Sequence, residues 1–456
     1  MSYPECLEKV VKQIEPSPEE REKIGQLADK VWVLVQQSIG EIIGDETVKA
    51  EYHGSYRHDT WLRGKADLDL FVLFSKRYAL EEMSQLVKKV AHSVAENLNA
   101  YVEERYASHP YYTLVLPDGQ EVELVPAYRV SSSQEVTTPV DRTQLHTEYL
   151  ERVLSEKPHL KAEIRLFKKL LMNLDVYGAE QSVHGFSGYL AEILVTYFGG
   201  LENLLLAAAN WRPGRIFIPP SPEARKLFQG QPIVVIDPVD LKRNAAASVS
   251  QEALSKLILI GKLFSENKDI MCCLLDPPNL RVTLEELVSV LNSYDVLVAM
   301  AAKYPKLPED ALLAKLQRIA RKSSSAMESY GFRVLRTHVT KINGSPAILF
   351  FFENMVQSPI YLHMGPPVWH PNSVEFVKKW ASRHIAPIII EGRVAVLRKR
   401  IPLDPRDYLL KALKSYPGFS WEINKLRDIV SYLPQEYYVE VYRWVTGVEN
   451  WTMCIQ

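Results

Sequence analysis

Residues 54–74 read Gly-Ser-Tyr-Arg-His-Asp-Thr-Trp-Leu-Arg-Gly-Lys-Ala-Asp-Leu-Asp-Leu-Phe-Val-Leu-Phe. A Gly-Ser turn and a polar, partly basic segment lead to Asp67 and Asp69, which stand at the head of the apolar run 70–74. The β-preferring residues of that run predict a buried strand. Because side chains alternate across a strand, the two aspartates are expected to point the same way from its beginning.

This pair of carboxylates predicts a metal and phosphate site. Neighbouring carboxylates repel each other and are costly to bury unless a cation lies between them. Mg²⁺ takes oxygen ligands of this kind, usually one or two carboxylates together with phosphate oxygens. The rest of such a site has to come from elsewhere in the chain.

A third carboxylate is available from a nearby hairpin. Residues 101–106, 111–116 and 121–128 are predicted to be strands, the last two joined by a turn at 117–119. Glu123 faces the aspartate pair if its strand neighbours theirs, and three carboxylates then form a two-metal site for phosphoryl transfer. In the alternative, Glu121 and Glu123 face solvent beside the hairpin. Spacing alone leaves both open.

Composition indicates a chain of several domains. At 456 residues, with 24% charged residues and a formal net charge of −1, two to four domains are expected. No run of eighteen apolar residues predicts a membrane span, and the N-terminus does not resemble a signal peptide. The four cysteines (Cys6, Cys272, Cys273 and Cys454) have neither disulfide-framework nor zinc spacing. We therefore predict a reducing, cytoplasmic location and no structural zinc.

The near-zero net charge hides a basic segment. Residues 311–400 contain fourteen Lys or Arg against four Asp or Glu, a net of about +10, which leaves about −11 for the rest. Such an asymmetry is typical of a protein with a polyanionic partner. The alternative is a solvated surface balanced by acidic neighbouring domains.

Apolar periodicity predicts the remaining elements. The expected helices are 3–14, 18–43, 80–98, 144–175, 187–209, 250–265, 283–296, 308–330, 372–383, 404–416, 420–431 and 434–446. Further strands are expected at 48–53, 233–236, 332–339, 347–353, 388–391 and 394–398. Strands with a packing helix in the basic segment suggest a small α+β module able to hold RNA. Phe350, Phe351 and Phe352 are either a base-stacking surface or alternate members of a core strand.

Two loops carry further polar candidates. At 139–146, Asp141 or Thr143 is expected to cap the following helix, whose N-terminus is suited to phosphate, and His146 is expected at the surface unless it binds a ligand. At 237–244 an acidic and basic turn follows a buried strand, and Arg243 is placed to reach a phosphate or a base edge.

Taken together, these motifs resemble a known family. Gly54-Ser55 with Asp67-x-Asp69 is similar to the signature of the polymerase beta-like nucleotidyltransferase superfamily. More narrowly, the chain resembles the archaeal (class I) CCA-adding enzymes, which are tRNA nucleotidyltransferases. The resemblance is carried by the blocks GSY-x3-TWL-x-G, VDRT-x2-H, VYGAE, GFSGYL and IDPVD-x-KRN, and more weakly by Met-Gly-Pro at 364–366.

The resemblance implies roles for particular residues. Asp67, Asp69 and Glu123 match the family's three catalytic, metal-binding carboxylates. Nucleotide-binding positions are implied at Gly54, Ser55, Arg57, His58, Thr143, His146, Lys168, Tyr177 and Arg243, with Arg243 helping to select C or A. The chain departs from the family pattern in two places. Relatives typically carry Glu, Asp and Asp where this chain has Asp, Asp and Glu. Relatives also often carry Arg where His58 stands, although Arg57 is adjacent.

The implied activity is template-independent addition of CCA to the 3′ end of tRNA from CTP and ATP, with two Mg²⁺ ions and release of pyrophosphate. The implied fold is an α+β multidomain chain. Its parts are a nucleotidyltransferase head (1–145), a helical, nucleotide-binding neck (146–270), a body (271–310 and 401–456) and a basic, tRNA-binding α+β tail (311–400). A homodimer is also implied. The alternatives are a poly(A) polymerase or oligoadenylate synthase-like enzyme and a non-catalytic RNA-binding protein on the same scaffold.

Overall fold

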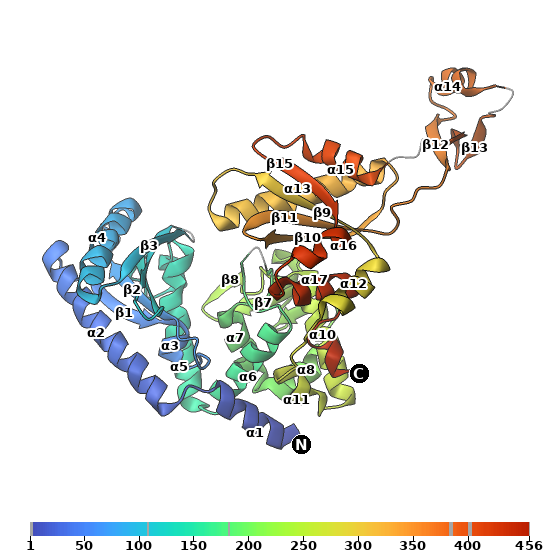
Figure 1. Ribbon diagram of the computed structural model, residues 1–456. Coiled ribbons are helices and arrows are strands. Elements are labelled where there is room, and N and C mark those ends of the chain that lie inside the picture. Colours follow the sequence, from blue (N-terminus) through green and yellow to red (C-terminus); the bar gives the residue numbers. More distant parts are fainter. Residues whose placement is uncertain (1–2, 107–108, 181–182, 383–385, 400–403, 456) are drawn as a thin grey trace. The chain divides into compact units, whose positions relative to one another are not determined.

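The computed structural model describes residues 3–106, 109–180, 183–382, 386–399 and 404–455 (Figure 1). The chain forms two compact units, Met1–Pro278 with Glu449–Gln456, and Asn279–Val448. The mixed α+β, multidomain fold is therefore confirmed. Residues 271–278 and 449–455, which we predicted as part of the body, belong to the first unit instead. Arg383 and Arg400 of the basic segment lie outside the described residues.

The elements of the first unit follow one another along the chain to residue 275. They are α1 (Tyr3–Ile14), α2 (Pro18–Ile42), β1 (Lys49–His53), α3 (Gly54–His58), β2 (Leu68–Phe74), α4 (Leu80–Leu98), β3 (Tyr101–Tyr106), β4 (Pro110–Val115), β5 (Glu121–Tyr128), α5 (Arg142–Glu156), α6 (Leu160–Asn173), α7 (Gly188–Phe198), α8 (Leu201–Ala208), β6 (Ile216–Ile218), α9 (Pro222–Leu227), β7 (Ile233–Asp237), β8 (Asp240–Asn244), α10 (Gln251–Glu266) and α11 (Ile270–Leu275).

The head is a five-stranded sheet in the order β1-β2-β5-β4-β3. One face of the sheet, which includes Leu68, Leu70 and Val72 of β2, shares a core with α2 and α4. The other side chains of β2 alternate to the opposite face, where Phe71 packs with Val125 of β5. Asp69 has the same parity as Phe71, so its side chain lies on the face that α2 and α4 do not cover.

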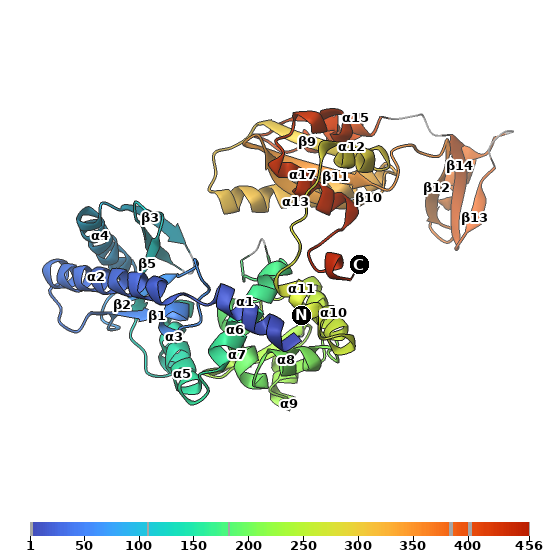
Figure 2. The same ribbon diagram turned by 60° about the horizontal axis from the view of Figure 1, so that its bottom comes forward.

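The neck is built from helices around a second apolar core, to which α1, α6, α7, α8, α10 and α11 contribute (Figure 2). Ser187 caps α7 by accepting from the Leu190 amide at 3.1 Å, and Ser250 caps α10 in the same way. The predicted helices 144–175 and 187–209 are each two helices. The first breaks around Pro158, because proline cannot donate a backbone hydrogen bond, and the second breaks at 199–200, where both glycines have positive φ.

The second unit contains two sheets. Its elements are α12 (Leu284–Asn292), β9 (Asp295–Lys303), α13 (Glu309–Ser329), β10 (Val334–Ile342), β11 (Ser345–Phe352), β12 (Ile360–Pro367), α14 (Ser373–Trp380), β13 (Ile388–Ile390), β14 (Arg393–Lys399), α15 (Pro405–Leu413), β15 (Ser420–Lys425), α16 (Leu426–Ile429) and α17 (Glu436–Thr446). The larger sheet has the order β10-β11-β9-β15. The predicted helix over 420–431 is wrong in its first half, because residues 420–425 pair with β9 as an edge strand.

Both faces of this larger sheet are covered. Ile348, Phe350 and Phe352 of β11 belong to a core shared with α13 and α15, whereas Leu349 and Phe351 belong to a core shared with α12 and α17. All three phenylalanines are therefore buried, and the base-stacking interpretation is wrong. Tertiary packing decides this point, since a strand covered on two faces is apolar at every position.

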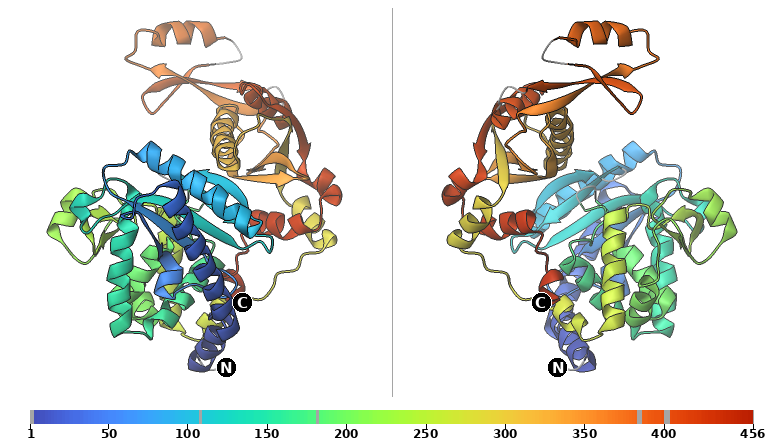
Figure 3. Two further views of the ribbon diagram at one scale, coloured as in Figure 1. Left: turned by 90° about the vertical axis from the view of Figure 1, so that its left-hand side faces the viewer. Right: turned by 90° about the vertical axis from the view of Figure 1, so that its right-hand side faces the viewer.

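The smaller sheet of the second unit, β12-β14-β13, packs against α14 as a module of its own (Figure 3). Residues 360–367, which we did not predict as a strand, pair with β14. His363 stacks on Phe376 of α14 with ring centroids 5.6 Å apart, and Arg398 lies over the Trp380 ring at 4.4 Å. The predicted small α+β module in the basic segment is thus present.

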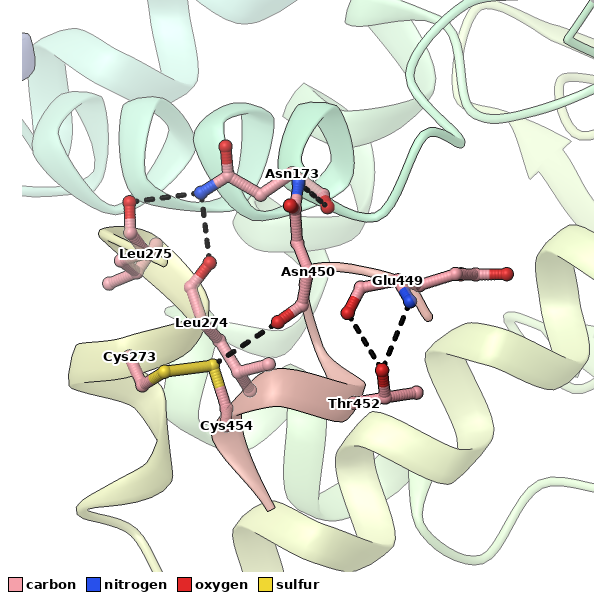
Figure 4. The surroundings of a disulfide bond; sticks show 8 residues. All are labelled: Asn173, Cys273, Leu274, Leu275, Glu449, Asn450, Thr452 and Cys454. Atoms are coloured by element: carbon pink, nitrogen blue, oxygen red, sulfur yellow. Dashed lines mark hydrogen bonds between the residues drawn. A yellow bond between two sulfur atoms is a disulfide. The ribbon is translucent and has the colours of Figure 1, made fainter. Parts of the chain in front are cut away.

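All four cysteines are paired in disulfides, Cys6 with Cys272 and Cys273 with Cys454. The Cα atoms of the pairs are 5.6 and 5.5 Å apart. Figure 4 shows the second pair beside Asn173, whose side-chain amide donates to the carbonyl oxygens of Leu274 and Leu275. Our interpretation of the cysteine spacing was wrong because the partners lie 266 and 181 residues apart and only the fold brings them together.

No single helix among the described residues has the length and apolarity needed to cross a membrane. The two helices α7 and α8, taken together as one bent pair, are long and apolar enough, but length and composition are the only evidence for a span.

Candidate active site

Three carboxylates lie on one face of the head sheet, the face that α2 and α4 do not cover. β2 and β5 are parallel neighbours, and Asp69 lies directly opposite Glu123 in their register. Asp67 precedes β2 by one residue and so shares the orientation of Asp69. The strand adjacency on which the third carboxylate depended is therefore confirmed.

The protonation of these groups reflects their crowding. Burial, together with the charges of Glu123 and Asp67, holds the pKa of Asp69 well above its ordinary value. Burial raises the pKa of Glu123 to about 7, against the opposing effect of Arg105, and burial also raises the pKa of Asp67. Arg105 is 3.8 Å from Glu123 but makes its short bonds, of 2.7 and 2.8 Å, with Glu121. These charges are thus poorly compensated by the protein.

The donor set fits a hard cation. In the described part of the chain, no three His, Cys, Asp or Glu side chains are already gathered into a ligand cluster. Carboxylates without a compensating cation repel each other. A divalent cation would relieve that repulsion, and carboxylate oxygens are the ligands that Mg²⁺ prefers.

Gly54 brings the backbone against these carboxylates. It opens α3 with φ of +68°, and a Cβ at this position would overlap Oδ2 of Asp69. Glycine is required here on both counts. The next residue, Ser55, is thereby placed beside the carboxylates.

A cavity of about 490 Å³ adjoins this face. It brings together four of the predicted residues, namely Ser55 and Asp67 from the head and Lys168 and Tyr177 from the neck. Burial raises the pKa of the Tyr177 phenol, which therefore stays protonated and able to donate. The cavity is lined by Ser55, Trp61, Leu62, Gly64, Lys65, Ala66, Asp67, Gly119, Gln120, Glu121, Lys168, Met172 and Tyr177.

Lys168 is held by a buried carboxylate that sequence reasoning missed. Its ammonium donates to Oε1 of Glu192 at 2.8 Å and to the carbonyl and hydroxyl oxygens of Thr60 at 3.3 and 3.2 Å. These three bonds use the three N–H groups of an ammonium. A phosphate contact by Lys168 therefore requires one bond to Thr60 to be exchanged.

The two predicted residues at 57 and 58 lie outside this cavity lining. Arg57 pairs with Glu151 of α5 at 2.6 Å. His58 is buried, with Nδ1 3.3 Å from Oε2 of Glu192. His58 thus joins the network around Glu192, which connects the head to α7.

Glu192 is expected to stabilise the fold strongly. Burial alone would raise its pKa, but Lys168 and His58 outweigh burial and hold the pKa far below the ordinary 4.5. Glu192→Gln leaves Lys168 buried without a counter-charge and should cost on the order of 3 kcal/mol of unfolding free energy. Because the folded-state pKa is depressed, this contribution is complete above pH 4.5 and is lost as the pH falls further.

Thermal unfolding at neutral pH and below pH 4.5 measures the effect. The difference between wild type and Glu192→Gln should be large at neutral pH and shrink in acid. Glu41→Gln, an exposed change on α2, is the control. Equal melting temperatures at neutral pH would contradict the assignment.

A second cluster joins two more predicted residues. Nε2 of His146 and Nη1 of Arg243 lie 2.9 and 2.7 Å from Oδ2 of Asp237, and the Tyr189 hydroxyl donates to Oδ1 at 2.8 Å. The rings of His146 and Tyr189 stack with centroids 3.7 Å apart. Burial lowers the pKa of His146, although Asp237 opposes the shift. The expectation of a surface histidine was wrong.

The predicted cap of α5 by the Asp141 side chain is not found. The Asp141 side chain does not cap the helix, because its carboxylate accepts from the backbone amides of Tyr128, Thr137 and Thr138 at 2.9, 2.9 and 2.6 Å. Thr143 is half-buried in the first turn, and its carbonyl oxygen accepts from the Thr147 hydroxyl.

The sequence of α7 contained an indication that Glu192 and Tyr189, which we did not predict as site residues, belong to the site. Glu192 is the one charged residue of α7, Gly-Tyr-Leu-Ala-Glu-Ile-Leu-Val-Thr-Tyr-Phe. An acid in such an apolar helix needs a buried cation. Tyr189 lies three residues earlier, on the same side of the helix.

Comparison with known proteins identifies the family of this chain. Residues 162–273 match the second domain of tRNA nucleotidyltransferases, and residues 295–426 match the C-terminal domain of CCA-adding enzymes. The chain is 34% identical to the CCA-adding enzyme of Pyrobaculum islandicum over 91% of this chain and 93% of that protein. It is 30% identical to that of Sulfolobus acidocaldarius over 92% and 94%, respectively. A solved cytoplasmic RNA terminal U-transferase gives a TM-score of 0.48 at 11% identity, covering 61% of this chain and 99% of that one. The chain belongs to the CCA-adding enzymes, a family of tRNA nucleotidyltransferases.

Proposed function

We propose that this enzyme adds CCA to the 3′ end of tRNA from CTP and ATP, without a nucleic-acid template. The observation that carries the proposal is the register of β2 and β5. It sets Asp69 opposite Glu123, and Asp67 beside them lines the same cavity as Ser55, Lys168 and Tyr177. In a member of the CCA-adding family, these groups are suited to nucleotidyl transfer.

In the proposed reaction, the 3′-hydroxyl of tRNA attacks the α-phosphorus of CTP or ATP, the bond to the bridging oxygen breaks, and pyrophosphate leaves. Asp67, Asp69 and Glu123 would hold two Mg²⁺ ions, which when bound acidify the attacking hydroxyl and neutralise the leaving group. Ser55 and Tyr177 donate hydrogen bonds to phosphate oxygens. Lys168 adds positive charge at the wall of the cavity.

The choice of base falls to the second cluster. C and A both present a ring nitrogen acceptor on the pairing edge, where U and G present an N–H group. Arg243 has donors to offer such an acceptor, and His146 and Tyr189 lie beside it. Protein side chains, together with the RNA end, therefore select the nucleotide.

The basic segment supplies the contact to tRNA. On α13, Arg318, Arg321 and Lys322 are exposed, and phosphate contacts of this kind fix position without reading sequence. Affinity for tRNA should therefore fall steeply as salt concentration increases. We also expect a cytoplasmic homodimer without a membrane anchor. Light scattering would test the dimer as a mass twice that of the 52.1 kDa chain.

The decisive experiment supplies tRNA lacking its 3′ CCA with labelled CTP and ATP, separately and together. CTP alone should extend the tRNA by C residues only, ATP alone should leave it unchanged, and both together should stop at CCA. An open-ended A tail would instead indicate a poly(A) polymerase, and 2′-5′ products an oligoadenylate synthase. Binding without any incorporation would indicate a non-catalytic RNA-binding protein.

A further inference from the structure

Asp237, at the end of β7, is a fully buried carboxylate with 0% exposure. It accepts hydrogen bonds from side chains on three different elements, His146 of α5, Tyr189 of α7 and Arg243 of β8. The backbone amide of Val239 adds a fourth bond at 3.1 Å. One ion thus gathers three potential nucleotide contacts that are far apart in the sequence.

Three of these four bonds come from side chains, and only the Val239 amide lies in the turn between β7 and β8. The base of this hairpin is held by Asn244 instead. Its Oδ1 accepts from the amides of Val235 and Ala246, both at 2.9 Å, and its Nδ2 donates to the carbonyl of Ile233 at 3.0 Å. The carboxylate of Asp237 is therefore used mainly to hold the three side chains.

The cluster continues directly from the phosphate cavity. A Cβ on Gly188, the first residue of α7, would lie 2.9 Å from the Tyr177 hydroxyl and 3.9 Å from Nζ of Lys168. The next residue is Tyr189, which bonds Asp237. The first turn of α7 therefore joins the cavity for the triphosphate to the cluster around Asp237.

Arg243 is bound by Asp237 through only one of its guanidinium nitrogens. Its side chain is 36% exposed, and Nη1 bonds Asp237. Nε and Nη2 have no protein acceptor in the portion of the chain that the structure describes. A guanidinium is a rigid planar fork, so a bond at one nitrogen orients the others.

We propose that Asp237 is a positioning residue for base selection, which aims the free N–H groups of Arg243 and fixes the His146–Tyr189 stack against the incoming base. This inference rests on the proposed function and adds to it the residue that sets its selectivity. Asp237 is well suited to the role because, although burial opposes it, His146 lowers the pKa of Asp237 to about 2. The carboxylate therefore stays ionised across the working range of pH.

The test compares Asp237→Asn with wild type in kcat/KM for CTP and for UTP on tRNA lacking CCA. An amide cannot replace both the charge and all three acceptor bonds, and hydrogen bonds to charged groups contribute about 1.5–3 kcal/mol. The ratio of kcat/KM for CTP to kcat/KM for UTP should fall by roughly 10- to 100-fold. A purely structural role would lower both values together and leave their ratio unchanged.

Asp240→Asn is the matched control, since Asp240 lies in the same turn but pairs with Arg142 at 2.9 Å. The CTP-to-UTP ratio of kcat/KM in Asp240→Asn should equal that of wild type. If Asp237→Asn melts below this control, Arg243→Lys carries the test, because its ammonium keeps the charge but lacks the planar fork. Retained selectivity in Asp237→Asn, or in Arg243→Lys where that variant carries the test, overturns the inference. Failure of the wild-type enzyme to add any nucleotide overturns the proposed function instead.

Discussion

Replacing Asp69 by Asn should abolish incorporation of CMP and AMP while leaving tRNA binding intact. Asp69 is opposite Glu123 in register and two residues after Asp67, and both of these carboxylates raise its pKa. Loss of the charge removes a proposed metal ligand, and metal ions contribute several kcal/mol to such transition states. We expect a fall in rate of at least about 10³-fold. The proposed contact between tRNA and the basic segment of the second unit does not involve this charge.

The same variant should be more stable than wild type in the absence of metal. The pKa of Asp69 is raised in the folded state by burial, Glu123 and Asp67, so the ionised form disfavours folding. The cost of the aspartate is present at neutral pH and disappears below its ordinary pKa of 3.8, where the group is protonated in both states. Asp69→Asn should therefore melt a few degrees higher at neutral pH, and this gain should vanish in acid.

Labelled nucleotide incorporation, tRNA gel shift and thermal unfolding measure these effects. Glu51→Gln, an exposed change on β1 of the same sheet, is the control and should leave all three near wild type. Incorporation by Asp69→Asn at the wild-type rate would refute the site. A lower melting temperature without metal would refute the electrostatic argument alone.

Cys454→Ser should lower thermal stability markedly under oxidising conditions. The disulfide to Cys273 closes a loop of 181 residues that contains the second unit, and a loop of this length contributes roughly 5 kcal/mol by restricting the unfolded chain. We expect a fall in melting temperature on the order of 10 °C. Noncovalent contacts of the C-terminal segment remain, since Glu449 pairs with Lys256 at 2.7 Å and Asn450 donates to the carbonyl of Asn173 at 3.1 Å.

Differential scanning calorimetry with and without reductant tests this prediction. The reduced wild type should be destabilised at least as much as the oxidised variant, because reduction opens both bonds. Thiol titration of the denatured protein should find no free thiol in wild type and one in Cys454→Ser. Identical melting of the two oxidised proteins would show that the bond does not contribute.

Sequence predicted the local features of the head well. Alternation in 67–74 predicted that Asp67 and Asp69 share a face, because the period of two is a property of any strand, whereas the position of Glu123 beside them was decided by the pairing of β2 with β5. Predictions failed where the secondary structure or burial of a segment depends on the tertiary contacts around it. Residues 420–425 are a strand only because β9 offers an edge, and Phe350 to Phe352 are buried together only because helices cover both faces of β11.

By itself, the stretch 54–74 predicted a Gly-Ser turn, a strand that begins with paired carboxylates and, from those carboxylates, a cation and phosphate site. The tertiary structure decided what those groups meet. It brought Glu192 to Lys168, gathered His146, Tyr189 and Arg243 on Asp237, and paired the four cysteines. The reason is physical. Alternation and capping are set by neighbours along the chain, whereas a buried charge or thiol finds its partner only when distant segments pack together.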